Sequence, residues 1–401
     1  MLSVYEKSPP LNSRIFFSGL NGIRAIAALA VVFSHITHEL DDFGLNPFIF
    51  GQNSDGNPKA TLLASFGVSI FFTLSGFLIT YLLLAEKQKG NINIKNFYIR
   101  RILRIWPLYY GYLILALITG FLFDFSVLKY SAFLYIFLLA NIPFIIGGML
   151  PFLGHYWSLG VEEQFYSFWP WNVKKSKSIL RTALVMCGGL ISLKILIRII
   201  DIKNLNGNTS LLYDALHVTR FHCMLIGAIA AILYFNKSRL LLLLTNNKIT
   251  QFLTWLIILL ITINKFHVAS LIDNELVSIV TVSLIIGQIE KRKRIINLNK
   301  SIFDFIGKIS YGIYVIHPLI IFYLSKVFFF SENAGIWSYI LVYAAVIGCT
   351  ITIAHFSYTY FEKYFLKMKD RFSTVMSSGT MRDVQSQVEV VFVEKTKANN
   401  F

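Results

Sequence analysis

Two ionisable residues lie within the first long apolar stretch of the sequence, where such side chains are unusual. Arg24 and His35 are eleven residues apart. At about 3.6 residues per turn, this spacing places both on one face of a helix, about 16 Å apart along its axis. Ionisable residues inside a membrane span are functional candidates, and histidine is suited to proton transfer near neutral pH. The ordinary alternatives are an Arg24 that reaches the lipid headgroups and a His35 that makes an interhelical hydrogen bond.

Two arginines in the segment NFYIRRILRIWPLYY have a spacing that suits phosphate binding. Arg101 and Arg104 are three residues apart and share a helix face, and guanidinium groups bind phosphate through paired hydrogen bonds. We expect this helix to end on its outer side at Trp106 and Pro107. The pair predicts a dock for a phosphorylated cytosolic cofactor, and the alternative is an ordinary basic loop.

Small residues interrupt an aromatic run in the second apolar stretch, FFTLSGFLIT. Ser75 and Gly76 either let two helices approach closely or leave a slot through which a thin substrate chain passes. The sequence is compatible with both interpretations.

Two neighbouring carboxylates lie in the aromatic segment 156–171, YWSLGVEEQFYSFWPW. Glu162 and Glu163 are adjacent, so on a helix they point to different faces, and at most one of them faces a catalytic cavity. The structural alternative is a glutamate that pairs with Arg24 or Arg220.

A polar stripe lies near the end of the chain in SYGIYVIHPLI. Ser310, Tyr311, Tyr314 and His317 fall at positions i, i+1, i+4 and i+7, which is one face of a helix. The stripe is either a set of functional candidates or a hydrogen-bonded core. Arg220, at the start of a later apolar run, is a further candidate.

The composition shows what kind of molecule must position these residues. Of 401 residues, 55% are hydrophobic and 14% are charged, with a mean hydropathy of +0.61. Soluble domains carry about 25% charged residues. The composition excludes a disordered chain, a nucleic-acid-binding protein and an ordinary cytosolic enzyme, and it favours a polytopic protein in a lipid bilayer. The three cysteines all lie in apolar runs and predict neither a disulfide framework nor a metal site.

The apolar runs predict an all-α polytopic membrane protein with about ten transmembrane helices. A bilayer core about 30 Å thick needs roughly 20 apolar residues per helix. The segment 156–171 is shorter and contains two carboxylates, so we expect a short re-entrant or interfacial helix there. In the alternative, 156–171 crosses and 130–149 does not. The predicted spans are 20–38, 60–85, 106–124, 130–149, 179–200, 218–235, 249–266, 271–289, 305–329 and 337–360.

The basic residues give the orientation and the domain plan. The formal net charge is +16, and the lysines and arginines cluster in five loops that ten spans place on one side. The positive-inside rule then puts both termini in the cytoplasm. We expect a cytoplasmic segment over 1–16, a membrane domain over 17–362 and a cytoplasmic polar tail over 363–401.

These motifs form an ordered set that resembles the acyltransferase-3 family of integral membrane O-acyltransferases. The set is Arg-x10-His, SGF, RxxR, WSLxxEExFY, RF and SYxxYxxH, and it covers about residues 17–362. One departure is His222, where an acidic residue is common in relatives. The resemblance implies a multi-pass protein of the bacterial cytoplasmic (inner) membrane.

The resemblance also implies an activity and roles for the residues. An acyl group, most often acetyl, would move from acyl-CoA to a hydroxyl of a cell-surface glycan or glycolipid, such as lipopolysaccharide, peptidoglycan or another lipid-linked saccharide. His35 would be the base and Arg24 would hold the thioester end. Arg101 and Arg104 would hold the CoA phosphates, with Ser75 and Gly76 beside the arm. We expect no metal and no fused SGNH domain.

Two other functions remain open from the sequence. Buried Arg, His and Glu side chains also occur in proton-coupled transporters and flippases of polysaccharide precursors. Such transporters commonly contain inverted repeats, and none is evident here. A structural subunit of a polysaccharide assembly complex is the third possibility.

Overall fold

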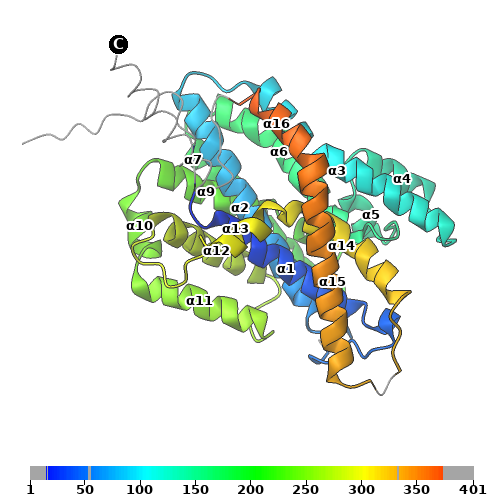
Figure 1. The fold of residues 1–401 in the computed structure, drawn as a ribbon. Helices are drawn as coiled ribbons and strands as arrows, with labels where there is room; N and C mark the ends of the chain where they lie inside the picture. The colour runs from blue at the N-terminus through cyan, green and yellow to red at the C-terminus, as the bar shows by residue number, and fades with distance from the viewer. Residues whose placement is uncertain (1–14, 16, 53–55, 332–333, 374–401) are drawn as a thin grey trace, which may run out of the picture.

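The computed structural model describes residues 15, 17–52, 56–331 and 334–373, and every regular element in these residues is a helix (Figure 1). The prediction of an all-α fold is confirmed. The first half contains α1 (Leu20–His38), η1 (Asp41–Phe43), α2 (Thr61–Gln88), α3 (Ile94–Leu122), α4 (Lys129–Ile136), α5 (Asn141–Ile146), η2 (Gly154–Tyr156), α6 (Trp157–Lys175) and α7 (Ile179–Asn204). The second half contains α8 (Leu211–Thr219), α9 (Phe221–Phe235), α10 (Arg239–Thr245), α11 (Lys248–Thr262), α12 (Asp273–Glu290), α13 (Ser301–Lys308), α14 (Ser310–Ser325), α15 (Ile336–Phe356), η3 (Ser357–Glu362) and α16 (Lys363–Asp370).

Six helical stretches among the described residues are long and apolar enough to cross a membrane, and the number rises to eight if each of two bent pairs is one span. The bent pairs are α10 with α11, at 56°, and α13 with α14, at 65°. Of the ten predicted runs, 271–289 forms α12, whose three carboxylates keep it outside this set. The other run outside the set is 130–149.

The prediction of a single span over 130–149 is wrong. The structure divides this run into the short helices α4 and α5. Leu138 has a φ of 62° between them, a left-handed conformation that interrupts a helix. By contrast, α6 is a continuous helix of 19 residues, about 28 Å long at about 1.5 Å per residue. The structure therefore favours the alternative in which α6, and not 130–149, passes through the molecule.

A second correction concerns Pro107. We expected the arginine-bearing helix to end there, but α3 continues through Pro107 to Leu122. A proline inside a helix removes one backbone hydrogen bond, and neighbouring helices make this tolerable in membrane proteins. Because α3 begins at Ile94, Arg101 and Arg104 lie well inside the helix and not in a loop.

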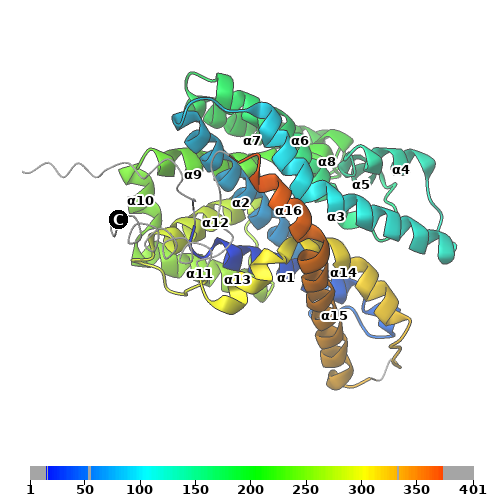
Figure 2. The ribbon, with the colours of Figure 1, turned by 45° about the horizontal axis from the view of Figure 1, so that its top comes forward.

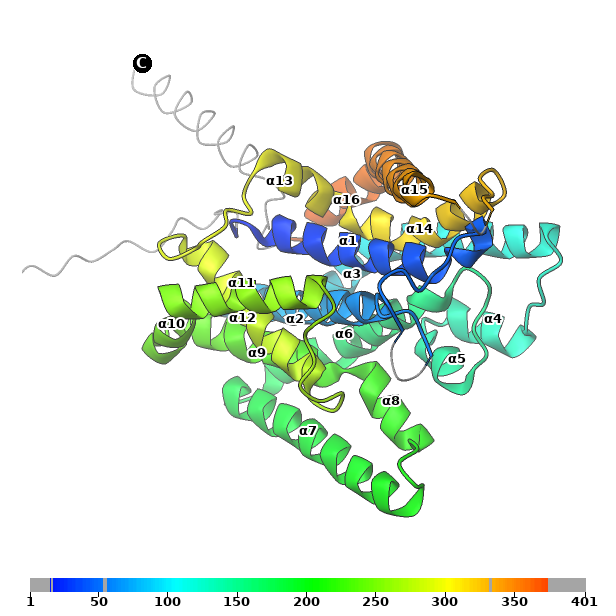
Figure 3. The same cartoon turned by 90° about the horizontal axis from the view of Figure 1, so that it is seen from below.

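Helix α2 is the centre of the molecule and packs most extensively against α9 and α1. Figure 3 shows α1 and α2 in the middle, with α13, α14 and α15 on one side and α7 at the opposite edge. Glycines bring α2 and α9 together, because a Cβ atom built at Gly76 would overlap the carbonyl oxygen of Met224. A Cβ atom at Gly227 would likewise overlap the carbonyl oxygen of Thr73.

The last helix returns to the start of α3. Helix α16 contacts α3, and Figure 2 shows the two lying side by side. A π-helical turn, η3, joins α15 to α16. Only residues 363–373 of the predicted polar tail lie in the described part of the chain, and residues 374–401 and most of 1–16 lie outside it.

Candidate functional site

A cavity of about 520 Å³ lies among the ends of several helices. This volume is within the range of about 300–1,000 Å³ that is usual for ligand pockets. The start of α1, the middle of α2, the first half of α3, the first half of α6, the start of α14 and helix α16 all contribute to its wall. Segments distant in the sequence thus converge on one space.

The cavity wall is strongly basic. It contains seven basic residues, namely Arg24, Arg101, Arg104, Lys308, Lys363, Lys367 and Lys369. It contains three acidic residues, Glu162, Glu362 and Asp370. Lys363 and Lys367 are exposed, so the cavity opens beside α16. An excess of positive charge in a recessed space attracts anionic ligands.

The three arginines of the wall form no direct ion pair with a carboxylate of the described residues. No ion pair within the described residues includes Arg24, Arg101 or Arg104. Nη1 of Arg24 donates to Oδ1 of Asn21 over 2.8 Å. The guanidinium of Arg101 lies 5.7 Å from the ring centroid of Tyr166, and its buried Nε atom has no hydrogen-bond partner among the described residues. Within this part of the protein, the three guanidinium groups are therefore not neutralised by direct ion pairs.

Arg100, next to this pair, shows the contrast. Its Nη2 atom pairs with Oε1 of Glu86 at 2.5 Å, and its Nη1 atom donates to the carbonyl oxygen of Phe372 over 2.8 Å. Arg100 does not line the 520 Å³ cavity. Adjacent arginines of α3 therefore have different surroundings, and it is Arg101 that faces the cavity.

Only one of the two adjacent glutamates faces the cavity. Glu162 lines it, and its Oε1 atom accepts a hydrogen bond of 2.6 Å from Oγ of Ser75. Glu163 is not a lining residue, and its Oε1 atom has no hydrogen-bond partner among the residues described. No ion pair there joins either glutamate to Arg24 or Arg220. Gly76 lies outside the cavity wall, at the contact of α2 with α9.

Three histidines from three elements meet near the cavity. Nδ1 of His35 lies 2.7 Å from Nε2 of His317. The rings of His155 and His317 are 5.2 Å apart between centroids. None of the three lines the cavity. His35 is only partly buried, whereas His317 is completely buried.

Tyr314 connects the histidines with the cavity. It lines the cavity, and its hydroxyl donates to the carbonyl oxygen of His155 over 2.9 Å. The same hydroxyl lies 2.5 Å from Oγ of Ser158, another lining residue. Tyr311 also lines the cavity and donates to the carbonyl oxygen of Ile105 over 2.8 Å. The stripe on α14 thus borders the cavity and continues to His317.

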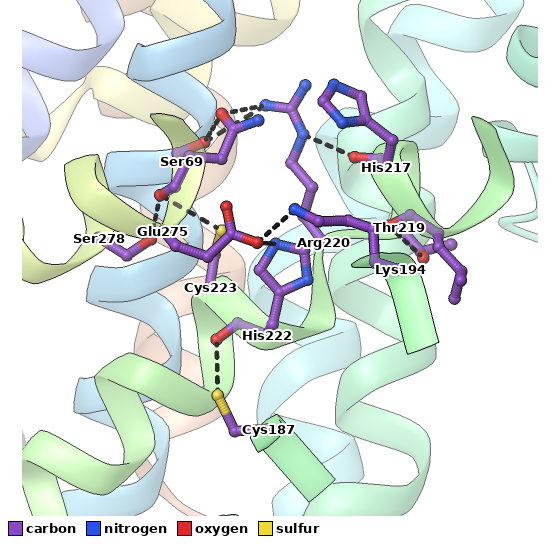
Figure 4. Close-up of polar contacts among 12 residues, drawn as sticks. Ser69, Cys187, Lys194, His217, Thr219, Arg220, His222, Cys223, Glu275 and Ser278 are labelled. Atoms are coloured by element: carbon purple, nitrogen blue, oxygen red, sulfur yellow. Dashed lines mark hydrogen bonds and ion pairs between the residues drawn. The ribbon is translucent and has the colours of Figure 1, made fainter. Parts of the chain in front are cut away.

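Arg220 lies outside the cavity wall in a buried hydrogen-bond network between α2, α8, α9 and α12 (Figure 4). Its Nη1 atom donates to the carbonyl oxygen of Ser65 over 3.0 Å and lies 3.2 Å from Oδ1 of Asn274. Its Nε atom donates to the carbonyl oxygen of His217 over 3.0 Å. Arg220 has a φ of 42° and separates α8 from α9. These contacts describe a structural role at the junction of four helices.

A buried ion pair beside Arg220 was not singled out from the sequence. Lys194 of α7 donates to Oε1 of Glu275 of α12, and Nε2 of His222 lies 3.2 Å from the same oxygen (Figure 4). Lys194 and Glu275 lie within the predicted apolar runs 179–200 and 271–289. An ionisable residue inside a membrane span is a functional candidate, so the argument used for Arg24 and His35 applies equally to this pair.

Other residues of the wall also escaped the sequence analysis. The lysines of α16 follow the last apolar run and have the pattern of an ordinary cytoplasmic end. Ser158 and Tyr166 lie in the motif that contains the two glutamates. Within the described residues, the one group that could hold a metal ion is Glu39, Asp41 and Asp42, and none of these three lines the cavity.

Comparisons with known proteins agree with the motifs. The sequence model of a family described as "Acyltransferase domain" matches residues 17–355. A protein of Staphylococcus aureus (strain COL), provisionally named an O-acetyltransferase, is 28% identical over 383 residues, which are 88% of this chain and 58% of that protein. No solved structure matches.

Two other relatives carry names that include a substrate. The peptidoglycan O-acetyltransferase OatA of Listeria monocytogenes is 32% identical over 170 residues, 39% of this chain and 24% of that protein. A protein of Bacillus subtilis (strain 168), provisionally named a peptidoglycan O-acetyltransferase, is 27% identical over 378 residues, 87% of this chain and 54% of that protein. The chain spans somewhat more than half the length of the relatives that it matches along most of its own length.

Proposed function

We propose that this chain, which belongs to the acyltransferase-3 family, moves an acetyl group from acetyl-CoA to a hydroxyl of a cell-surface glycan or glycolipid. The chain is a multi-pass membrane protein related to bacterial O-acetyltransferases. The observation that carries the donor assignment is the basic cavity, whose three arginines have no ion-pair partner among the described residues.

The phosphates of CoA account for the charge of the cavity. Arg24, Arg101 and Arg104 are partly buried, and a charge that is partly removed from water without a direct partner costs free energy. An anionic ligand offsets this cost, and guanidinium groups bind phosphates through paired hydrogen bonds. We assign the phosphates to Arg101 and Arg104, with the exposed Lys363 and Lys367 at the cavity opening. This places the negatively charged end of the donor at the basic opening of the cavity.

The thin pantetheine arm then extends inward past Ser75 and Glu162. Arg24 also lines the cavity. Because Arg24 and His35 are eleven residues apart on one helix, they are separated by about 16 Å along the axis. This distance is too large for both side chains to hold one reacting carbonyl. We therefore assign Arg24 to the arm of the donor and Glu162 to the ordering of the wall beside it.

His35 is the proposed general base. Its Nε2 atom takes the proton of the acceptor hydroxyl while the hydroxyl oxygen attacks the thioester carbonyl carbon. The bond between carbon and sulfur then breaks, and the departing CoA sulfur receives the proton from Nε2. The new ester and free CoA–SH leave, so the base is regenerated and no other reactant is needed.

Tyr314 and Ser158 lie where the donor meets the histidines. Their hydroxyl groups are 2.5 Å apart at the part of the cavity wall nearest to His155 and His317. Both hydroxyl groups also contact the carbonyl oxygen of His155. If one of them turns from this carbonyl toward the cavity, it can donate to the oxygen on which negative charge develops during acyl transfer. The thioester must pass these two residues to reach His35, which lies outside the cavity wall.

The acceptor reaches His35 from the side opposite the basic opening. His35 is partly exposed although it does not line the cavity, which supports a separate approach. With both termini in the cytoplasm of a bacterial cell, this side faces outward. The names of two relatives favour peptidoglycan among the glycan acceptors.

The test is acetyl incorporation by membranes that contain the chain. Membranes are incubated with acetyl-CoA carrying a ¹³C label, and the glycan fraction is analysed by mass spectrometry. We expect label on glycan hydroxyls, and we expect His35→Ala to reduce it by about 10²–10⁴-fold. His38→Ala, one turn further along and exposed, is the matched control.

Equal incorporation with and without the chain would overturn the proposal. Wild-type incorporation by a correctly inserted His35→Ala protein would overturn the assignment of the base.

A further inference from the structure

The hydrogen bonds of His317 show which of its ring nitrogens carries the hydrogen and, through it, which nitrogen of His35 does. Nδ1 of His317 lies 3.2 Å from the carbonyl oxygen of Ile313. A carbonyl oxygen only accepts hydrogen bonds, so Nδ1 of His317 carries the hydrogen. In a neutral imidazole the other nitrogen is then an acceptor. Nε2 of His317 therefore accepts, and its partner over 2.7 Å, Nδ1 of His35, must donate.

The chain of donors fixes the tautomer of His35. If Nδ1 of His35 carries the hydrogen, then its Nε2 atom carries the lone pair. The direction of every hydrogen bond from Ile313 to His35 is set by the carbonyl at the start, which cannot donate. A general base needs this unprotonated nitrogen at the atom that meets the acceptor hydroxyl.

We propose that His317 is a positioning residue, which holds His35 in the tautomer with hydrogen on Nδ1 and so presents the unprotonated Nε2 to the acceptor hydroxyl. This inference rests on the proposed role of His35 as the base. His317 itself touches neither the cavity nor the reacting atoms that we assign.

The surroundings of His317 keep its ring in one orientation. The side chain is fully buried, so bulk water does not compete for its nitrogens. The ring of His155 packs against it at an interplanar angle of 62°, and Nε2 of His155 lies 3.1 Å from the carbonyl oxygen of Val315. The ring of His35 lies at 29° to that of His317, with centroids 4.9 Å apart.

Pro318 adds to this arrangement on the same helix. It follows His317 directly inside α14 and has no N–H group. The carbonyl one turn earlier, that of Tyr314, therefore has no backbone donor from position 318. The turn that bears His317 thus keeps an acceptor-rich backbone, which favours hydrogen on Nδ1 and disfavours a flipped ring.

Two substitutions distinguish positioning from packing. His317→Leu fills the same buried space with an apolar side chain but removes the acceptor nitrogen. We expect it to lower kcat by roughly 10²-fold with little change in the KM for acetyl-CoA. His317→Gln places an amide oxygen near the position of Nε2 and an amide NH₂ that can donate, so we expect kcat within about tenfold of wild type. His355→Leu, an exposed histidine of α15, is the control for removing a histidine.

NMR of ¹⁵N-histidine-labelled protein reads the tautomer directly. The chain has eight histidines, so the His35 signal is identified as the one lost in His35→Ala. We expect a protonated Nδ1 and an unprotonated Nε2 in the wild type, and a shift towards the other tautomer in His317→Leu.

Three results overturn the inference. One is hydrogen on Nε2 of His35 in the wild type. Another is wild-type kcat in His317→Leu while His35→Ala is inactive, which would leave the proposed function intact. A third is an equal loss of kcat in the Leu and Gln variants. An active His35→Ala protein would instead remove the base assignment on which the inference rests.

Discussion

Oγ of Ser75 donates a hydrogen bond of 2.6 Å to Oε1 of Glu162, although the two residues are 87 positions apart. The contact joins the middle of α2 to the middle of α6, and both residues line the cavity. It therefore fixes the direction in which the one cavity-facing member of the glutamate pair presents its second oxygen.

We predict that Glu162→Ala lowers kcat/KM for acetyl-CoA by about tenfold or more, and that Ser75→Ala lowers it by about fivefold. A hydrogen bond to a charged group contributes about 1.5–3 kcal/mol, and the carboxylate retains its place when only the hydroxyl is lost. Initial rates at varied acetyl-CoA measure both. Ser167→Ala, on the exposed face of α6, is the control. Unchanged kinetics in Glu162→Ala would remove this residue from the site.

The arginine pair should act on the binding of the donor. Phosphate contacts that are equally strong in the ground and transition states affect KM and not kcat. We predict that Arg101→Ala and Arg104→Ala each raise the KM for acetyl-CoA by about tenfold. Saturation curves for donor and acceptor are measured separately.

Arg239→Ala is the matched control for this pair, because Arg239 is exposed, belongs to another basic loop and does not line the cavity. If the double Arg101→Ala, Arg104→Ala protein has an unchanged KM for acetyl-CoA, the two arginines do not bind the donor and reflect only the orientation of the chain in the membrane. An equal rise in the control would point to a general effect of charge.

Orientation is tested with single cysteines. Cys187, Cys223 and Cys349 are replaced by alanine, and one cysteine is placed at Gln88, Arg292 or Asn208, all exposed. With both termini in the cytoplasm, a membrane-impermeant thiol reagent on intact cells labels only position 208. Labelling of 88 or 292 before permeabilisation contradicts the proposed entry of CoA from the cytoplasm.

The ion pair of Lys194 with Glu275 should be a large contributor to stability. Removing one member of a buried pair leaves the other charge without its partner and costs about 3–5 kcal/mol. We predict large falls in the thermal unfolding midpoint for Lys194→Met and for Glu275→Gln. The double variant should lose much less than the sum of the two, which is the sign of coupling.

Simple additivity in that cycle would show that the two side chains are energetically independent. Arg198→Met serves as the control, because Arg198 is another cation of α7 and donates to the carbonyl oxygen of Asn208 near the surface.

The sequence predicted the helical architecture well because apolar run length and helix formation are local properties. Eight of the ten apolar runs correspond to the six candidate spans and two bent pairs. The exceptions are 271–289, which forms α12 with three carboxylates, and 130–149, which depends on a left-handed Leu138 that hydropathy does not encode. Local periodicity also placed Tyr311, Tyr314 and His317 on a single helix.

The tertiary partners of the site residues could not be predicted from the sequence. His35 and His317 are 282 residues apart, and nothing in either segment specifies the other. The lysines of α16 had the pattern of a cytoplasmic boundary, because charge alone does not show which face of a helix closes over a cavity. Arg220 appeared as a site candidate, yet its partners Ser65 and Asn274 come from other helices and make it part of the frame.

The seam between α2 and α9 limits how the protein can move during turnover. At Gly76 and Gly227 each backbone lies directly against a carbonyl of the opposite helix, so neither helix can slide or rotate without a steric clash. The two therefore behave as one rigid body. An opening that lets a thioester pass from the cavity to His35 is therefore expected on the other side of the cavity, where α6 carries Ser158 and α14 carries Tyr314. The close α2–α9 contact would then serve as the fixed frame against which these two elements move.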